Sequence, residues 1–419
     1  MATRQASLQL PSPAIAEQLD RSVAEGIDLN SGRVQSSSDD AWQGLRDLGS
    51  ELWLDTGDID LAAEMWVDEF TALTTNNTLL NAEVQKGIYD DLVSEVAGVL
   101  SGVDQRTLVV EIAFFLNARH GLRLVQRFGT KVSVELHTDL AHDIERAVYY
   151  GKRIHAICPD YFVVKVPLTP AGLLVTRRLR EDGVPVNFTL GFSARHNYLA
   201  TKVAKPSYVN VFLGRLGSYL ANNDLGDGAF AGERATLASQ RVVTELAAGY
   251  SEPTKQIAAS LRAGSQVVDV AGVDVMTMPP GVAQVARPSN GEWVSHLDTV
   301  YDVKLADSVD PKSVRVEVLW DVTEAEQRLA ASLDEDVPTS AEALVDRAHK
   351  FGVPDLFPRL DTASLGHLAE DGKIPVHTRW ASGVAGGQLA IDTLLNLAGL
   401  ASFTADQAAL DQRIERLLG

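Results

Sequence analysis

Cysteine is almost absent from this chain of 419 residues, which contains Cys158 alone. A single cysteine excludes an intrachain disulfide and a zinc site built from several thiolates. The chain also lacks any uninterrupted run of about 20 apolar residues, so the sequence predicts no membrane-spanning helix. Its first residues have no sustained apolar core of the kind found in signal peptides. Together these absences predict a cytoplasmic protein that does not bind a membrane.

Positive charge is also scarce. The 37 lysines and arginines are outnumbered by 56 aspartates and glutamates, which gives a formal net charge of −19. Such an excess of negative charge argues against nucleic acid as the main partner. A small phosphorylated substrate is still compatible with it, because a local pair of arginines suffices to bind a phosphate group.

The overall composition, 45% hydrophobic and 22% charged, is typical of a globular protein. The length suits one large α/β barrel with additions, or two to three smaller domains. Eight short stretches rich in β-branched and aromatic residues alternate with helical stretches, at residues 52–58, 71–77, 131–135, 161–169, 184–192, 208–214, 257–262 and 274–278. This alternation predicts an α/β fold, a closed (β/α)8 TIM barrel.

We expect three parts in the chain: an N-terminal helical arm at residues 1–50, the barrel core at 51–285, and a mostly helical extension at 286–419. The extension would complete and cover the barrel. Within it, the hydrophobic pattern predicts a strand at residues 314–320 and helices at 323–333, 341–350, 364–371 and 389–418.

The fourth predicted strand, YFVVKVPLT, is apolar except for Lys165 and its terminal threonine. A run of this kind is typical of a strand buried on both faces. Burying an ammonium group without a partner is costly, so we expect Lys165 to lose its proton or to face a wet cavity. Both outcomes suit a lysine that forms a Schiff base with a carbonyl substrate. The alternative is a lysine at the end of the strand that extends to solvent.

Polar residues recur at the carboxyl ends of the other predicted strands. In a parallel barrel these ends surround the active site, and they carry Asp55, Asn76, Glu135, Asn187, Thr189, Asn210, Ser260 and Arg262. Because alternate residues of a strand share a face, Asn187 and Thr189 are predicted to point the same way, and so are Ser260 and Arg262.

These positions suggest a division of labour around a lysine nucleophile. Asp55 and Glu135 are candidate acids and bases, and Thr189 is a candidate to hold a water between them. Taken singly, each residue also has a structural explanation: a turn for Asp55 and a solvated strand end for Glu135. Arg215 and Arg262 are candidates for binding phosphate, with the alternative that each pairs with an acidic side chain.

The chain resembles the transaldolase family in an ordered set of stretches: LWLDTGD, TTNN, VSVELHTDLAHD, VVKVPLTPAG, VNFTLGFS, FLGRLG and AASLRAG. The resemblance covers residues 52–279. It implies a barrel enzyme of carbohydrate metabolism, such as the pentose phosphate pathway, whose fourth-strand lysine forms a Schiff base with a ketose. Such an enzyme passes a dihydroxyacetone unit from a ketose phosphate, of the sedoheptulose 7-phosphate or fructose 6-phosphate type, to an aldose phosphate. It needs no metal and no organic cofactor.

The resemblance assigns a role to each candidate. Lys165 corresponds to the Schiff-base lysine, Asp55 to the acid/base at the cleaved carbinol, and Glu135 with Thr189 to the pair that positions the catalytic water. The implied substrate-binding residues are Asn76 and Asn187 at the hydroxyls of the dihydroxyacetone unit, Asn210 beside them, and Phe212, Arg215, Ser260 and Arg262 at the phosphate site.

The chain departs from the family pattern in three ways. Asn77 stands where the family usually has proline, and Asn210 where it usually has serine. The stretch KVPLTPAG resembles the aldolase-like branch, whereas Glu135 and Phe212 resemble the transferase branch. The extension exceeds the usual family length, so it is expected to cap the site or to form an interface, for example in a homodimer.

Three alternatives stay open on the sequence. One is a transaldolase-like aldolase or a biosynthetic enzyme that acts on a different sugar. A second is a metal-dependent hydrolase whose metal would be bound within the run HTDLAHD, by His137, Asp139, His142 and Asp143. The third is a barrel without catalysis that serves as an interaction protein.

Overall fold

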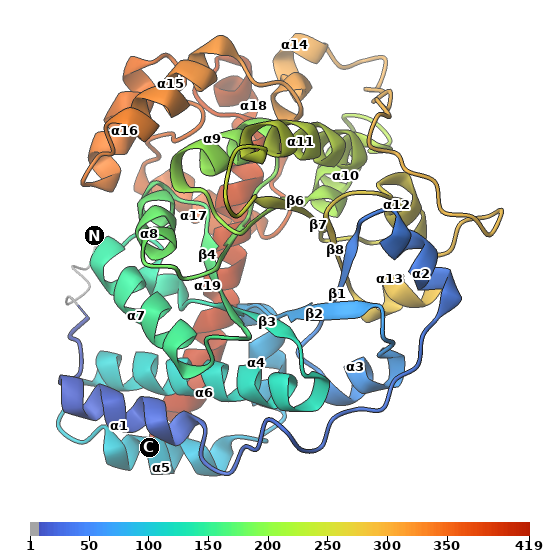
Figure 1. The fold of residues 1–419 in the computed structure, drawn as a ribbon. Coiled ribbons are helices and arrows are strands. Elements are labelled where there is room, and N and C mark those ends of the chain that lie inside the picture. The colour runs from blue at the N-terminus through green and yellow to red at the C-terminus, as the bar shows by residue number, and fades with distance from the viewer. Residues whose placement is uncertain (1–7) are drawn as a thin grey trace.

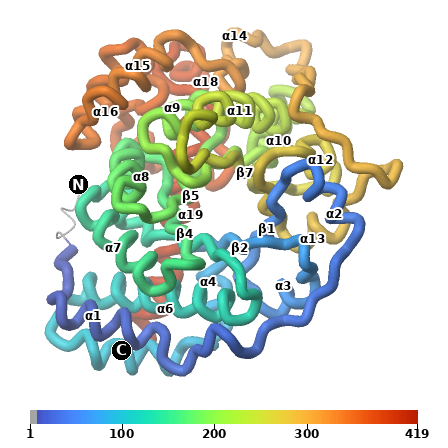
Figure 2. Tube along the Cα trace, in the orientation of Figure 1, coloured from blue at the N-terminus to red at the C-terminus, as the bar shows by residue number. Residues whose placement is uncertain are grey.

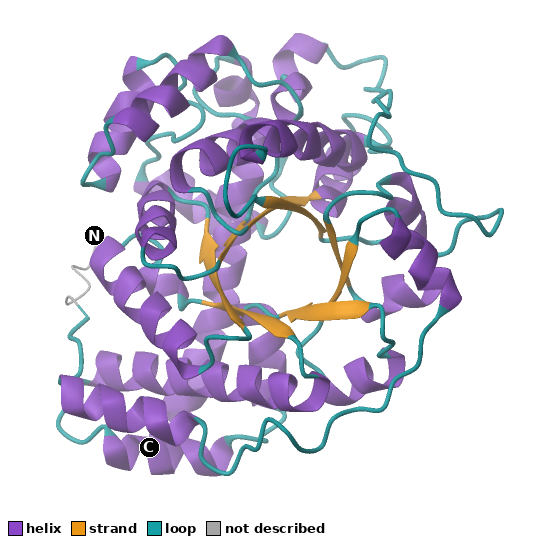
Figure 3. Cartoon of the chain, in the orientation of Figure 1, coloured by secondary structure: helices purple, strands orange, loops and turns teal. Residues whose placement is uncertain are grey.

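The computed structural model describes residues 8–419, and its centre is a closed barrel of eight parallel strands in the order in which they occur in the sequence (Figures 1 and 3). The predicted (β/α)8 TIM barrel is therefore confirmed. The strands are β1 (Glu51–Asp55), β2 (Phe70–Thr74), β3 (Lys131–Glu135), β4 (Phe162–Pro167), β5 (Val186–Thr189), β6 (Tyr208–Phe212), β7 (Lys255–Ala259) and β8 (Val275–Met278).

Helices surround this ring on all sides (Figure 3). After β1 to β5 a capping side chain starts the next helix, as where the Thr169 side chain caps the helix that begins at Pro170. The surrounding helices are α1 (Pro13–Val23), α2 (Asp40–Asp47), α3 (Ile59–Met65), α4 (Asn77–Gln85), α5 (Asp90–Val99), α6 (Gln105–Phe128), the 3₁₀ turn η1 (Thr138–Leu140), α7 (Ile144–Ile157), α8 (Pro170–Glu181), α9 (Ala194–Ala204), α10 (Leu213–Asn222), α11 (Ala231–Ala247), α12 (Gly264–Asp269) and α13 (Pro280–Val285).

The remaining chain adds a group of helices at one side of the barrel. Between α13 and the next helix, the chain runs along the outside of the molecule without a helix or a strand (Figure 2). The helices that follow are α14 (Pro311–Val314), the 3₁₀ turn η2 (Val316–Leu319), α15 (Glu324–Glu335), α16 (Ala341–Lys350), α17 (Thr362–Asp371), α18 (His377–Ala385) and α19 (Ile391–Leu418).

The long helix α19 connects this group to the barrel. It runs behind the ring of strands in Figure 1 and packs against α4, α5 and α6. A buried ion cluster fixes its first turn, because the Asp392 carboxylate accepts hydrogen bonds at 2.7 and 2.8 Å from the guanidinium of Arg195 on α9. Glu326 on α15 and Asp355 contact the same guanidinium at 2.9 and 3.3 Å.

The structure corrects several details of the prediction. Residues 314–320 form a helical turn, α14 and η2, instead of a strand. A closed barrel has no free edge, so an additional strand here would leave its backbone groups without partners. The hydrophobic pattern predicts one helix at residues 81–100 and another at 139–151. The structure has two helices, α4 and α5, in place of the first, and the second begins at Ile144, with Asp143 as its cap. Three helices, α10, α13 and α18, were not predicted.

Two of the strand ends also differ from the prediction. Strand β7 ends at Ala259, so Ser260 and Arg262 do not share a strand face; Ser260 instead adopts a left-handed backbone conformation, with φ 59°. Asn76 lies beyond the end of β2 and caps α4, because its side chain accepts a hydrogen bond from the backbone N–H of Leu79. Among the described helices, none combines the length and apolar character needed to cross a membrane.

Candidate active site

Three residues of neighbouring strands lie at one level of the barrel interior. In the strand register Glu135 of β3 is paired with Lys165 of β4, and Lys165 is paired with Asn187 of β5. All three side chains are buried. This places a potential nucleophile between a carboxyl group and an amide at the carboxyl end of the barrel strands.

A cavity of about 130 Å³ opens beside these residues. Of the catalytic and substrate-binding residues that the resemblance implies, only Glu135 and Arg262 are absent from its lining. The lining consists of Asp55, Thr74, Asn76, Thr78, Leu79, Lys165, Asn187, Thr189, Asn210, Phe212, Arg215, Ile257, Ala259, Ser260, Thr277, Lys373 and Phe403. Residues from seven strands or strand ends and from the C-terminal helices thus meet at one place.

The amine of Lys165 is buried but loosely held. Its Nζ donates a hydrogen bond to the Thr75 carbonyl at 3.1 Å and lies 3.8 Å from Oε2 of Glu135. The ring of Phe403 lies on another side, with its centroid 5.9 Å from Nζ. The 3.8 Å separation is too long for a hydrogen bond, so the amine keeps freedom to bind a substrate.

The two carboxyl groups near the cavity share an electrostatic environment. Burial raises the pKa of Asp55, while the charge of Lys165 and a 2.8 Å hydrogen bond from the Thr74 hydroxyl oppose this rise. Burial likewise raises the pKa of Glu135, opposed by the charge of Lys165 and by the backbone N–H of Asn77, which donates to Oε2 at 3.3 Å. Carboxyl groups with raised pKa values are suited to both donating and accepting protons near neutral pH.

A chain of amide hydrogen bonds orients the polar wall beside Lys165. Asn210 donates to Oδ1 of Asn187 at 3.1 Å, and Asn187 donates in turn to the hydroxyl of Ser133 at 3.1 Å. The amide oxygen of Asn210 accepts the backbone N–H of Gly191 at 3.2 Å. Asn210, one of the departures from the family pattern, thus fixes the orientation of Asn187.

The hydroxyl of Thr189 differs from these amides. It is fully buried, it borders the cavity, and it has no hydrogen-bond partner within residues 8–419. A buried polar atom of this kind is normally satisfied by a water or a ligand.

Arg215 forms the cationic side of the cavity. It lies in the first turn of α10, packs over the ring of Phe212 and is buried, yet its Nη1 has no hydrogen-bond partner within the described chain. Burial and the nearby positive charge of Arg262 lower its pKa to about 10. Arg262 itself is exposed. Two cations placed close together, neither of which forms an ion pair within residues 8–419, are suited to an anionic ligand.

Gly214 explains how the two arginines come together. A Cβ atom at this position would lie 2.2 Å from the carbonyl oxygen of Ser260 and 2.8 Å from Cγ of Arg262. Only glycine therefore allows the segment after β7 to pack against the first turn of α10.

Among the lining residues that were not predicted from the sequence, two come from the C-terminal extension. Phe403 belongs to α19, and Lys373 lies in the connection between α17 and α18. Phe403 also contacts Arg215, whose guanidinium carbon is 5.7 Å from the ring centroid. Neither residue stands in a recognisable motif, and only the fold brings them to the barrel.

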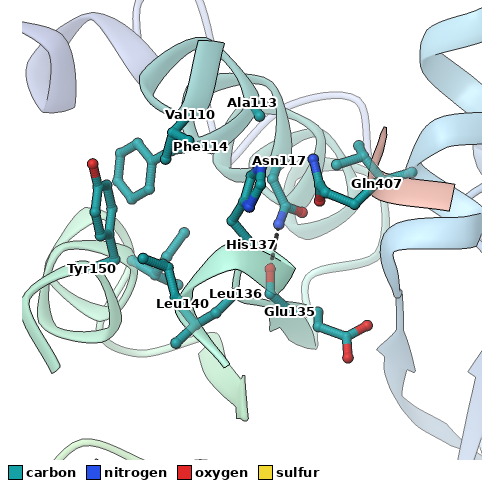
Figure 4. Close-up of a pocket in the computed structure, with 12 residues that line it drawn as sticks. Val110, Ala113, Phe114, Asn117, Glu135, Leu136, His137, Leu140, Tyr150 and Gln407 are labelled. Atoms are coloured by element: carbon teal, nitrogen blue, oxygen red, sulfur yellow. Dashed lines mark hydrogen bonds between the residues drawn. The ribbon is translucent and has the colours of Figure 1, made fainter. Parts of the chain in front are cut away.

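A second, mostly apolar pocket of about 20 Å³ lies behind the end of β3, between α6, α7 and α19 (Figure 4). The Glu135 carboxylate points away from it, while the Glu135 carbonyl accepts a hydrogen bond from Asn117 at 2.6 Å. The small volume and apolar lining of this pocket are those of a packing defect in the core. The side chain of Glu135 points away from the pocket, so the pocket is not part of the cavity at Lys165.

Of the four residues of the metal alternative, His137, Asp139 and Asp143 have other partners. His137 Nδ1 accepts the backbone N–H of Asp139, and its Nε2 lies 3.2 Å from Asp411. Asp139 pairs with Arg106, and Asp143 caps α7. In the part of the chain that the structure describes, no three histidine, cysteine or acidic side chains are grouped as metal ligands.

The fold and the cavity define a (β/α)8 barrel with a buried lysine between two carboxyl groups. Comparison with known proteins agrees: the model of the transaldolase/fructose-6-phosphate aldolase family matches residues 52–336. The chain is 28% identical over 257 residues to a transaldolase of Xanthomonas euvesicatoria, which covers 59% of this chain and 78% of that protein. It is 36% identical over 204 residues to a probable transaldolase of Thermus thermophilus, covering 45% and 83%. The chain belongs to the transaldolase/fructose-6-phosphate aldolase family, which is a family of enzymes.

Proposed function

We propose that this protein is a transaldolase that transfers a dihydroxyacetone unit from a ketose phosphate to an aldose phosphate through a Schiff base on Lys165. The observation that carries the proposal is the position of the Lys165 amine, inside the barrel and between the carboxyl groups of Glu135 and Asp55. The proposed substrates are sugar phosphates.

Formation of the Schiff base requires proton transfers that Glu135 can perform. The neutral amine of Lys165 attacks the C2 carbonyl of the ketose, and the resulting carbinolamine loses its hydroxyl group as water. Glu135, whose pKa burial raises, supplies the proton that the leaving hydroxyl needs. The Thr189 hydroxyl, buried without a protein partner, holds the released water for the later hydrolysis.

Cleavage of the C3–C4 bond is assigned to Asp55. It accepts the proton of the C4 hydroxyl while the bonding electrons pass into the Schiff base, which releases an aldehyde and leaves an enamine on Lys165. The enamine then attacks the acceptor aldehyde and Asp55 returns the proton. Asn76 and Asn187 bind the hydroxyl groups of the retained unit.

The phosphate group is assigned to Arg215, Arg262 and Ser260. Arg215 presents an unpartnered guanidinium nitrogen to the cavity, and a guanidinium binds phosphate through charge-assisted hydrogen bonds. The Phe212 ring packs against the Arg215 side chain, with its centroid 5.1 Å from the guanidinium carbon.

Reductive trapping tests this function directly. Borohydride added in the presence of fructose 6-phosphate is expected to leave a mass adduct on Lys165, located by peptide mass spectrometry, whereas the Lys165→Met variant takes up none. Activity abolished by a chelator, without an adduct, would support the metal hydrolase instead. If neither an adduct nor a chelator effect is observed, the result would support the interaction protein without catalysis. Release of free dihydroxyacetone without an acceptor would indicate the aldolase.

A further inference from the structure

The cavity is completed by a part of the chain that lies beyond the family match. The match ends at residue 336, yet Lys373 and Phe403 both line the cavity. The region after the barrel therefore contributes directly to the substrate site of this protein.

Lys373 lies in a connection that is fixed from both sides. Asp371, the last residue of α17, accepts hydrogen bonds from the backbone N–H of Val376 at 3.0 Å and from the indole of Trp380 at 3.1 Å. These contacts close the connection into a compact turn around Gly372, which has a left-handed φ of 71°. The turn that presents Lys373 is therefore a formed structure.

The same turn is attached to α10, the helix that begins beside the cavity with Arg215. Asn223, just after α10, donates to the Pro375 carbonyl at 3.0 Å and accepts the backbone N–H of His377 at 2.8 Å. The Tyr219 hydroxyl and Nδ1 of His377 are hydrogen-bonded at 2.7 Å. One helix thus positions both Arg215 and the turn that carries Lys373.

The charges at this side of the cavity are unmatched. Lys373 has no ion-pair partner in residues 8–419, although the chain as a whole carries a net charge of −19. Arg215 also lacks a partner for its Nη1. In such an acidic protein, cations left unpaired around one cavity indicate an anionic ligand.

We propose that Lys373 is a specificity-determining residue that binds the phosphate group of the substrate together with Arg215 and Arg262. The inference rests on the proposed function and extends it to the C-terminal helices. Lys373 lies on an exposed turn, so it adds its charge from the solvent side and selects phosphorylated over unphosphorylated sugars.

Binding of inorganic phosphate to the full chain, measured by calorimetry, tests this role without requiring turnover. Lys373→Met removes the charge and keeps the length of the side chain, and it is expected to weaken phosphate binding about tenfold, as for one charge-assisted hydrogen bond. Lys373→Arg keeps the charge and is expected to stay within about threefold of the unmodified protein. Lys350→Met, at an exposed position on α16, is the matched control and should leave the affinity unchanged.

Three results would overturn the inference: no phosphate binding by the unmodified protein, equal affinity in Lys373→Met, or the same loss in Lys350→Met. The borohydride adduct on Lys165 is measured separately on the same four proteins in the presence of fructose 6-phosphate, and it reports on the proposed function. An adduct that persists in all variants while phosphate affinity does not respond to Lys373 sinks the inference and leaves the transaldolase mechanism standing. If no adduct forms but Lys373→Met weakens phosphate binding as expected, the transaldolase mechanism is wrong and the phosphate-binding role of Lys373 stands.

Discussion

Buried charges are matched around Arg195, whereas around Lys165 they are not. The Arg195 cluster comprises Arg195, Asp392, Glu326 and Asp355, and the guanidinium contacts all three carboxylates at 2.7 to 3.3 Å. In the Lys165 cluster, which comprises Lys165, Glu135, Asp55 and Arg215, the shortest contact between opposite charges is the 3.8 Å from Lys165 to Glu135. The first cluster joins helices to one another, and the second borders a cavity.

The carboxyl groups of the two clusters respond to pH in opposite ways. Burial alone would raise the pKa of Asp392, but Arg195 holds it well below its usual range, so its contribution to stability is present above its unfolded pKa and is lost as acid protonates it. Burial raises the pKa of Glu135 and Asp55, so their ionisation costs stability as the pH rises above their unfolded pKa values. The Arg195 cluster stabilises the fold at neutral pH, and the Lys165 cluster gives up stability for reactivity.

The largest expected effect comes from removing the nucleophile of the weakly paired cluster. We expect Lys165→Met to lower kcat by roughly four orders of magnitude, because no Schiff base forms. The fold should survive, since Lys165 makes one hydrogen bond and no close ion pair. Turnover and thermal unfolding by circular dichroism check both parts. A variant that retains near-normal turnover would exclude Lys165 as the nucleophile.

Removing the cation of the Arg195 cluster should lower the stability of the fold. Arg195→Met leaves the fully buried Asp392 without its cation, and breaking such a pair costs about 3–5 kcal/mol. Arg328→Met is the matched control, because the Arg328 side chain is 62% exposed and its surface pair is worth about 0–1 kcal/mol. Denaturant unfolding measures both. Equal stability losses in the two variants would mean that the buried Arg195 cluster stabilises the fold no more than a surface ion pair does.

The contrast between the clusters also explains what the sequence could predict. Lys165 and Glu135 were found because an ionisable group within or at the end of an apolar strand conflicts with its surroundings, and barrel geometry brings strand ends together. The fourth strand was recognised because both faces of β4 are buried in the barrel and its residues are therefore mostly apolar. The fold and most of the cavity wall follow from these local signals.

The missing parts depend on contacts that no local pattern encodes. Helix α10 was not predicted because Gly214 and Gly217 lower helix propensity, yet close approach of Ser260 and Gly228 requires glycine at both positions. Lys373 stands in a polar turn that looks like any surface loop. Its position at the cavity comes from the attachment of that turn to α10, which only the tertiary structure supplies.

A smaller effect is expected on the cationic side of the Lys165 cluster. Arg262→Ala should raise KM about tenfold for fructose 6-phosphate and leave KM for unphosphorylated fructose unchanged, because one charge-assisted contact to phosphate is lost. Arg359→Ala, in the connection between α16 and α17 and at an exposed ion pair with Glu342, is the control. Steady-state kinetics with both sugars measures the difference. An equal change in KM for both would argue against a phosphate site at Arg262.

The smallest expected effect concerns the hydrogen bond that the Glu135 carboxylate accepts from a backbone N–H. Asn77 stands where the family usually has proline, and its N–H, which proline lacks, donates to Oε2 of Glu135 at 3.3 Å. This bond favours the ionised carboxylate and so lowers the pKa of Glu135. Asn77→Pro should fold, because residue 77 is the first of α4 and the preceding Asn76 is extended, with φ −157° and ψ 173°.

The sign of the expected change follows from the loss of that bond. In Asn77→Pro the pKa of Glu135 rises further, so more of Glu135 keeps the proton that it donates at a given pH, and the basic limb of the kcat profile moves to higher pH. On that limb the rate should rise roughly threefold, the value of a modest hydrogen bond. Asn77→Ala keeps the N–H and removes only the side chain, so its limb should stay in place. Identical pH profiles for the two variants would show that the backbone of residue 77 does not tune Glu135, and that the proline of the family and the asparagine of this chain are equivalent there.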